Sequence, residues 1–268
     1  MKEEILVNVS SREVRVAVVE NGVLLEVLLE RSSRRGLVSN IYKGTVSRVL
    51  PGMQAAFLDV GLARTAFLHA SDIRQEDTEN GESRAPNIRD LIREGDDLLV
   101  QVLKDPMGTK GARLTTYISI PSRFLVYLPR GNGVGVSTRI EDDAERTRLR
   151  EMVESMVPPE QSGGFIVRTA AEGASHEALR ADMMFLAKLW NAILDRRDQT
   201  DGMGLVYEDL DLPRRILRDM LSADVERIRV DNDDAFERMS EFAQTFIPEL
   251  APVIENYQRD RPIFDLYN

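Results

Sequence analysis

The segment IYKGTVSRVLPGMQAAFLDVGLARTAFL, residues 41–68, decides the fold of this chain. A Pro-Gly pair and a later glycine divide it into two strand-like runs and the start of a third. Because strand side chains alternate between two faces, Phe57 shares a face with Asp59, and Phe67 shares one with His69. Each of these strands therefore places one aromatic ring on the face that otherwise carries polar groups.

The sequence allows two roles for these rings. Aromatic rings on the wet face of a small sheet stack the bases of single-stranded nucleic acids. Alternatively, Phe57 and Phe67 fill a second core or a contact between domains. The alternation taken alone favours packing.

Residues 37–119 around this segment consist of short strand-like runs separated by turn residues. Residues 97–104 and 112–118 alternate well, and the polar segment 75–86 is predicted to be a mobile loop. Five short strands in about 80 residues predict a small barrel of the OB type. Lys110 lies in a glycine-flanked turn before the last strand, where its ammonium either reaches a phosphate or is simply solvated.

Both ends of the chain read as regular structure. Asn21-Gly22 between apolar runs predicts a type I′ hairpin turn, because both of its central positions need positive φ. Polar segments at 31–36 and 200–203 are predicted boundaries. The elements predicted at the ends are strands at 4–8, 13–20, 23–29 and 225–230, and helices at 213–221 and 233–246.

The middle of the chain mixes strands and helices after Pro121. Strands are predicted at 124–128 and 163–169, one helix at 141–156 and a longer helix after a Ser175 cap. Trp190 recurs with the apolar positions of that longer helix and is predicted to pack. The chain as a whole is therefore predicted to be α+β.

Arg168-Thr169 ends the glycine-led strand at 163–169 and has two interpretations. In one, the arginine forms an ion pair with Glu172 or a helix acid, and the threonine ends the strand. In the other, a planar guanidinium and a hydroxyl hold a terminal phosphate by charge-assisted hydrogen bonds. The residues alone favour the structural interpretation, since most surface arginines form no special interaction.

Composition excludes several classes of protein. The 268 residues are 43% hydrophobic and 30% charged. The absence of cysteine excludes a disulfide framework and a thiolate metal site, and the presence of only two histidines argues against a His-built metal site. The net charge of −10 argues against binding nucleic acid through bulk positive charge. The charged start predicts no signal peptide, and no apolar run approaches the roughly 18 residues of a membrane span. We expect a cytoplasmic protein.

Five short runs together carry a resemblance to a known family. They are 40–44 (NIYKG), 55–57 (AAF), 111–116 (GARLTT), 167–170 (VRTA) and 262–264 (PIF). Together they resemble the ribonuclease E/G family, and within it the ribonuclease G branch more than the ribonuclease E branch. The likeness extends in order over essentially the whole chain. It implies an α+β multidomain fold, in which an RNase H-like domain is interrupted by an inserted OB-fold β-barrel and an α+β 5′-sensor domain. The implied ranges are 1–35 and 214–268 (RNase H-like, structural in this family), 36–119 (OB fold) and 120–213 (5′ sensor).

The resemblance also implies site residues. Thr138 stands where some members carry a second pocket arginine, so either Arg139 supplies that charge or the pocket relies on Arg168. The implied positions are Phe57, Phe67, Lys110 and Lys43 for RNA, and Arg168, Thr169, Arg139 and the backbone near Val126 for a 5′-monophosphate.

Catalysis is expected to lie outside these residues. The family cleaves RNA with an aspartate pair that binds Mg²⁺ in a deoxyribonuclease-like domain, and a later cysteine pair shares zinc between subunits. Neither pair matches this sequence, so we expect no catalytic residue, metal site or bound cofactor here, and a chain cut from a longer protein. Asp96-Asp97 and Asp142-Asp143 are explained by a strand start and a helix start.

The resemblance thus implies a ribonuclease G-like endoribonuclease, acting in rRNA maturation and mRNA decay. Its partner would be single-stranded, A/U-rich RNA, preferably 5′-monophosphorylated, with Mg²⁺ as cofactor, no membrane partner and a homo-oligomer at full length. One alternative is a non-catalytic RNA-binding or assembly module. A more distant alternative is a metal-dependent nuclease complete within these 268 residues.

Overall fold

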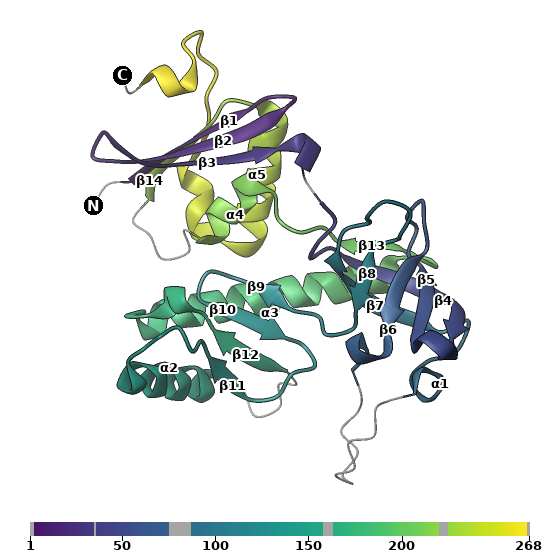
Figure 1. Ribbon diagram of the computed structural model, residues 1–268. Coiled ribbons are helices and arrows are strands. Elements are labelled where there is room, and N and C mark those ends of the chain that lie inside the picture. Colours follow the sequence, from purple (N-terminus) through teal and green to yellow (C-terminus); the bar gives the residue numbers. More distant parts are fainter. Residues whose placement is uncertain (1–2, 35, 75–86, 158–162, 220–224, 267–268) are drawn as a thin grey trace.

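The computed structural model describes residues 3–34, 36–74, 87–157, 163–219 and 225–266 (Figure 1). The strands of these residues form three sheets, each with its own helices or turns. The predicted mobile loop at 75–86 and the predicted helix end at 220–221 lie outside the described residues. In the described residues, no helix combines the length and apolar character needed to cross a membrane.

One sheet is assembled from both ends of the chain. Its order is β15-β14-β1-β2-β3, with β1 parallel to β14 and antiparallel to β2. In the turn between β2 and β3, Asn21 and Gly22 have φ of 50° and 81°, as a type I′ turn requires. The strands are β1 (Glu3–Val9), β2 (Glu13–Glu20), β3 (Val23–Arg31), β14 (Val225–Val230) and β15 (Ile254–Asn256).

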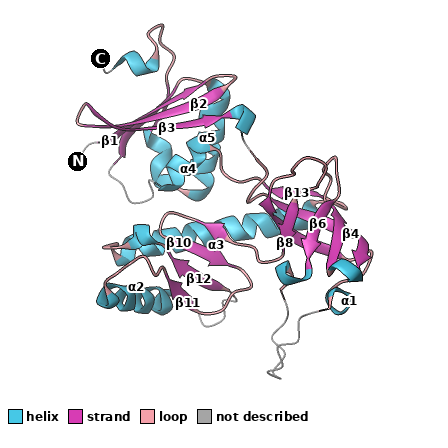
Figure 2. Ribbon diagram, viewed as in Figure 1, coloured by secondary structure: helices cyan, strands magenta, loops and turns pink. Residues whose placement is uncertain are grey.

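The two faces of this terminal sheet are covered differently. Helices α4 (Leu212–Asp219) and α5 (Asp233–Phe246) lie on one side, where Ile5 and Val7 join the largest core cluster (Figure 2). On the other side, a small cluster forms around Leu6 and includes residues from the end of the chain. β3 is an edge strand, and five of its apolar side chains are at least half exposed: Val23, Leu24, Leu25, Val27 and Leu29.

Residues 41–68 form most of a closed barrel. Its strands follow the order β4-β5-β6-β8-β7, and β7 pairs back with β4 to close the sheet. β6 and β8 are parallel, and the other pairs are antiparallel. This confirms the predicted OB-type barrel. The strands are β4 (Ile41–Leu50), β5 (Ala55–Asp59), β6 (Ala66–His69), β7 (Asp97–Lys104) and β8 (Arg113–Thr115), with the short helix α1 (Ile88–Leu91) before β7.

The third sheet packs on two helices. Its order is β11-β12-β10-β9, and its buried side chains pack with those of α2 (Asp143–Met156) and α3 (His176–Gln199). Asp142 and Ser175 cap the two helices by accepting backbone N–H bonds, and of these the Ser175 cap is as predicted. The strands are β9 (Ile120–Pro121), β10 (Leu125–Leu128), β11 (Val134–Val136) and β12 (Gly164–Val167).

Helix α3 connects this third sheet to the barrel. Trp190 on α3 contacts the Tyr127 ring with centroids 6.2 Å apart, so it packs as predicted. After α3, β13 (Gly204–Tyr207) pairs with β4 and extends the barrel sheet. The sequence reasoning did not predict β13 or β15, because each is shorter than five residues and shows little alternation.

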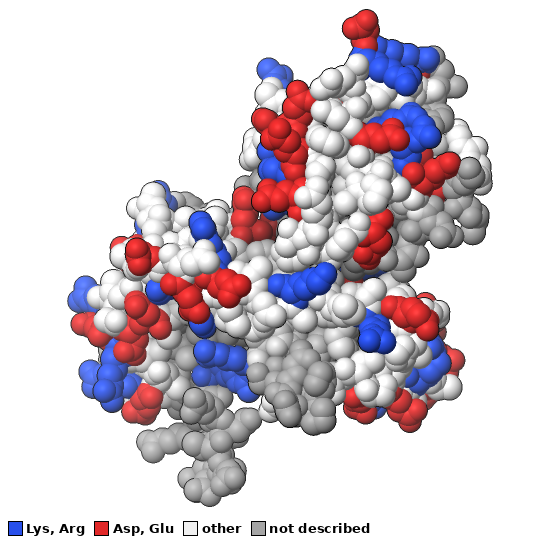
Figure 3. All heavy atoms as spheres, turned by 180° about the vertical axis from the view of Figure 1, so that it is seen from behind, with Lys and Arg blue, Asp and Glu red and all other residues white. Residues whose placement is uncertain are grey.

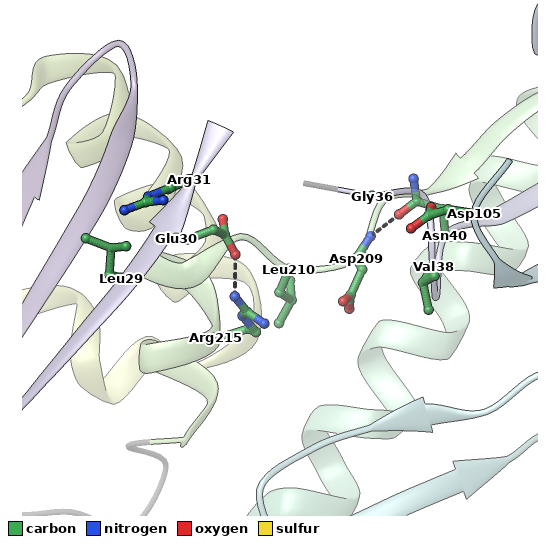
Figure 4. A pocket seen from close by; sticks show the side chains of 10 residues that line it. All are labelled: Leu29, Glu30, Arg31, Gly36, Val38, Asn40, Asp105, Asp209, Leu210 and Arg215. Atoms are coloured by element: carbon green, nitrogen blue, oxygen red, sulfur yellow. Dashed lines mark hydrogen bonds and ion pairs between the residues drawn. The ribbon is translucent and has the colours of Figure 1, made fainter. Parts of the chain in front are cut away.

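The chain passes between the terminal sheet and the barrel twice, once after β3 and once between β13 and α4. Residues of both segments line a hollow of about 560 Å³ (Figure 4). On the barrel side, the side-chain oxygen of Asn40 accepts a bond from the Asp209 backbone N–H at 2.8 Å. On the sheet side, Glu30 of β3 forms an ion pair with Arg215 of α4. The first contact ties the barrel to the segment that leads back to the terminal sheet, and the second holds α4 to β3 within the part that contains that sheet.

Candidate nucleic-acid interface

The barrel brings Phe57 and Phe67 together on its outer surface. They are directly paired in the register of β5 and β6, with ring centroids 6.1 Å apart in an edge-to-face arrangement. Their neighbours Leu58 and Leu68 point inward and are fully buried, whereas both phenylalanines stay partly exposed and outside the barrel core. The structure therefore does not support the interpretation that these rings fill a core.

Lys110 is held close to these rings by the turn between β7 and β8. The backbone groups of Met107 and Lys110 bond each other at 2.9 and 3.1 Å, which closes the turn. The turn also lies tightly on β6, because a Cβ on Gly111 would stand only 1.9 Å from the Thr65 carbonyl oxygen. Phe57, Phe67 and Lys110 consequently line one hollow of about 680 Å³.

The same hollow contains residues that the sequence reasoning missed. Met53 and Met107 are 60% and 76% exposed at its rim, on the turns after β4 and after β7. Polarizable thioethers make favourable contacts with aromatic rings and adapt to irregular shapes, which suits a base-binding surface. The signal in the sequence was a methionine beside glycine in each of two predicted turns.

Lys43 does not reach this hollow. It lies on β4, where its ammonium donates a 2.8 Å bond to the carbonyl oxygen of Thr200 at the end of α3. A cation at that position satisfies an otherwise unpaired helix carbonyl and interacts favourably with the helix dipole. In this structure Lys43 therefore joins the end of α3 to the barrel.

The third sheet gathers Arg168, Thr169 and a further hydroxyl at one end. The Arg168 guanidinium donates through Nη1 to the carbonyl oxygens of Ser122 and Arg123, the second at 3.3 Å. Thr169 is exposed, and its Oγ1 lies 3.3 Å from Oγ of Ser137. The sequence reasoning missed Ser137, whose only signal was its position one residue before Thr138.

The two remaining predicted residues flank this group. The backbone N–H of Arg139 donates to Ser137 Oγ at 3.3 Å, so exposed Arg139 belongs to the same turn as Ser137. Val126 pairs with Ile166 in the sheet. Because Ile166 stands two positions before Arg168, the side chains of Val126, Ile166 and Arg168 lie on the same face. A guanidinium, two hydroxyls and a nearby second arginine form an arrangement that suits a phosphate.

The described carboxylates do not fit a magnesium site. No group of three or more histidine, cysteine, aspartate or glutamate side chains gathers within the part of the chain that the structure describes. Asp142 caps α2 and Asp143 pairs with Arg146, while Asp96 and Asp97 accept bonds from the Arg93 backbone and the Thr45 hydroxyl. Each carboxylate of these adjacent pairs is thus already engaged by a local donor.

The terminal sheet is no better suited to a metal. At the ends of β1 and β14, Asp231 accepts bonds from the side-chain amide of Asn8 and the backbone of Val9. Arg15 in turn donates to the amide oxygen of Asn8 at 2.6 and 2.9 Å. One carboxylate surrounded by an amide and a guanidinium does not supply the oxygen ligands that Mg²⁺ takes.

Charge on the visible surface is mixed. On the face that Figure 3 shows, Lys and Arg side chains are interspersed with Asp and Glu side chains. With a net charge of −10, binding of an anionic polymer must depend on local groups rather than on a basic field.

Comparisons with known proteins agree with this geometry. Residues 38–116, which contain the barrel, match the description "S1 RNA binding domain", and residues 119–268 match "Ribonuclease E/G family". Ribonuclease G of Haemophilus influenzae is 48% identical over 98% of this chain and 54% of its own length. Ribonuclease G of Escherichia coli is 48% identical over 100% of this chain and 55% of its own length, and Ribonuclease E of the same species is 35% identical over 100% and 25%.

This chain therefore spans about half the length of the Ribonuclease G relatives. Among solved structures, the crystal structure of the a/eIF2alpha-aDim2p-rRNA complex from Pyrococcus horikoshii matches at 14% identity and a TM-score of 0.25, covering 78% of this chain and 96% of that chain. A score that low supports no shared fold, so the sequence matches carry the relationship.

Proposed function

Because this chain belongs to the ribonuclease E/G family, we propose that it is the RNA-binding and 5′-monophosphate-sensing portion of a ribonuclease G-like endoribonuclease. The substrate of the whole enzyme is single-stranded, A/U-rich RNA, cut during rRNA maturation and mRNA decay. Mg²⁺ and the aspartate pair that binds it belong to a further domain, and no step is assigned to this chain's own carboxylates. The whole enzyme acts as a homo-oligomer.

The observation that carries this proposal is the facing pair Phe57 and Phe67 with Lys110 in the same hollow. In OB folds, the surface of the second and third strands and the turns after the first and fourth strands bind oligonucleotides. β5 and β6 are the second and third strands of this barrel, and Lys110 lies on the turn after the fourth. Two bases would stack on the rings, at roughly 1–3 kcal/mol each, while Lys110 holds a backbone phosphate.

The second half of the proposal concerns the 5′ end of the RNA. Arg168 would bind a terminal monophosphate through its guanidinium, and Thr169 through its hydroxyl, with Arg139 adding charge from the neighbouring turn. Holding the 5′ end raises the local concentration of downstream RNA at the cleavage site, which is a positioning effect. We assign the third sheet with α2 and α3 to a 5′-sensor domain, and the terminal sheet to a structural RNase H-like domain.

Direct binding separates the two sites. A fluorescent single-stranded oligoribonucleotide is titrated in a 5′-monophosphate and a 5′-hydroxyl form. Phe57→Ala is expected to weaken both forms equally, by about 1–3 kcal/mol, because it removes a stacking surface far from the 5′ end. Arg168→Ala is expected to remove the preference for the phosphorylated form and to leave the hydroxyl form unchanged.

The opposite patterns would reject the assignments. If Arg168→Ala leaves the preference intact, the phosphate is held elsewhere. If Phe57→Ala weakens only the phosphorylated form, Phe57 belongs to the 5′ pocket and not to a stacking surface. Ala187→Ser, on the exposed side of α3, is a matched control that should change neither form.

A further inference from the structure

A buried carboxylate lies behind the Arg168 pocket. Asp182 of α3 has no exposed surface, yet it accepts a 2.5 Å bond from the hydroxyl of Ser122. It also accepts bonds from the backbone N–H groups of Arg123, Phe124 and Leu125, at 3.2, 3.0 and 2.8 Å. One carboxylate thus fixes four consecutive residues, the three before β10 and the first residue of that strand.

The same peptide groups also hold Arg168, from their opposite side. The carbonyl of Ser122 and the N–H of Arg123 belong to one peptide group, and the carbonyl of Arg123 and the N–H of Phe124 belong to the next. Both carbonyls accept from Nη1 of Arg168, while both N–H groups donate to Asp182. In a trans peptide the N–H and C=O point in opposite directions, so fixing one fixes the other.

We propose that Asp182 is a positioning residue for recognition of a 5′-terminal phosphate, acting on Arg168 through these two peptide groups. This inference rests on the proposed function of the Arg168 pocket. Asp182 orients the two carbonyls, the carbonyls fix Nη1, and the rigid planar fork of the guanidinium then presents its other N–H groups in one direction. Asp182 never touches the phosphate.

The charge of Asp182 also strengthens the bonds that hold Arg168. Hydrogen bonds in a chain polarise one another, so a carboxylate at the N–H side makes each carbonyl a better acceptor for the guanidinium. Burial raises the pKa of Asp182, and the bonds from Ser122 and the three backbone N–H groups oppose that rise by favouring the ionised form. These four hydrogen bonds thus offset part of the free-energy cost of burying the carboxylate.

The test uses the full chain with the substitution Asp182→Asn, which keeps the size of the side chain but removes its charge and one acceptor oxygen. We expect the affinity for the 5′-monophosphorylated oligonucleotide to fall about tenfold, the size of one lost charge-assisted hydrogen bond. The affinity for the 5′-hydroxyl oligonucleotide should stay unchanged, because the barrel hollow does not involve Asp182.

A purely structural role predicts another pattern, which a matched control reveals. Leu179→Ala empties a buried position one turn earlier on the same helix and lowers the thermal unfolding temperature, but it removes none of the hydrogen bonds that Asp182 makes with residues 122–125. If Leu179→Ala and Asp182→Asn reduce the phosphate preference equally at equal loss of stability, Asp182 is only structural and the inference is wrong.

A second readout keeps this inference separate from the proposed function. The side-chain N–H signals of Arg168 are recorded by ¹⁵N NMR without RNA, and Asp182→Asn is expected to broaden them by releasing Nη1. Unchanged signals overturn the inference, even if Arg168→Ala confirms the pocket. If the unmodified chain shows no phosphate preference, the sensor function itself fails, while the NMR comparison still decides whether Asp182 holds Arg168.

Discussion

Two lysines that the sequence presents alike have different surroundings in the structure. Lys110 lies in the hollow with the two phenylalanines, and Lys43 bonds the end of α3. Lys110→Met is expected to weaken RNA binding and to lower the slope of log affinity against log salt by about one, since one phosphate contact is lost. Lys43→Met is expected to leave that slope unchanged and to cost about 0.3–1 kcal/mol of stability.

Titrations at several salt concentrations and thermal unfolding of both variants measure these effects. If both variants lose salt dependence equally, Lys43 also contacts an RNA phosphate, and its bond to Thr200 is not its main role.

A second residue-scale effect concerns Glu145 on α2. The bond from Arg148, followed by the backbone N–H of Gly173, lowers the pKa of Glu145 from 4.5 to about 2. A carboxyl whose pKa is lower in the folded state contributes stability above its unfolded pKa and loses it as the pH falls. We therefore expect the chain to lose stability between pH 4.5 and about 2, and Glu145→Gln to make that loss shallower.

Chemical denaturation across this pH range measures the effect. Glu151→Gln, on the exposed face of the same helix, is the matched control because it removes one carboxylate without these two bonds. Identical pH profiles for Glu145→Gln and the unmodified chain would exclude the ion pair as a source of stability.

At the scale of elements, the turn between β7 and β8 depends on a glycine. A Cβ at Gly111 would collide with the backbone of Thr65, so Gly111→Ala must move the turn away from β6. We expect weaker binding of both oligonucleotide forms, because Lys110 moves away from Phe67, and a loss of roughly 1–3 kcal/mol of stability from overpacking.

Gly52 in the turn after β4 offers the control. A Cβ there meets nothing within 4 Å, so Gly52→Ala should change stability by no more than about 0.5 kcal/mol. Oligonucleotide titrations and denaturant unfolding of both variants decide the matter. Normal RNA affinity in a folded Gly111→Ala chain would show that Lys110 does not need this placement.

At the scale of the whole molecule, a hydrogen bond to Asn40 ties the barrel to the segment that leads back to the terminal sheet. Asn40 is 5% exposed, and it satisfies the backbone N–H of Asp209 on the returning segment. Asn40→Ala removes this buried hydrogen bond, which should cost about 1–3 kcal/mol, whereas Asn191→Ala on the exposed side of α3 should cost little.

Denaturant unfolding measures the cost, and small-angle X-ray scattering measures the placement of the two parts. We expect a larger radius of gyration for Asn40→Ala at equal secondary-structure content. An unchanged radius and unchanged stability would show that the bond between Asn40 and Asp209 does not hold the joint.

Several local elements could be predicted from the order of nearby residues. The alternation in residues 55–60, the hairpin at Asn21-Gly22 and the Ser175 cap are all as predicted, because each depends only on nearby residues. The alternation also placed Phe57 and Phe67 on the outer face of the barrel, although it favoured packing as their use. Their use as a stacking surface remains a proposal that the edge-to-face pair and its hollow support.

Contacts between distant side chains could not be predicted in this way, because they depend on how separate elements pack. The bond from Lys43 to Thr200 joins positions 157 residues apart, and the bond from Ser122 to Asp182 joins positions 60 apart. Short β13 finds its place only because β4 offers a free edge to pair with. The period of a side-chain pattern fixes the face on which a residue lies, but the packing of separate elements fixes what that face meets, and no local pattern contains that information.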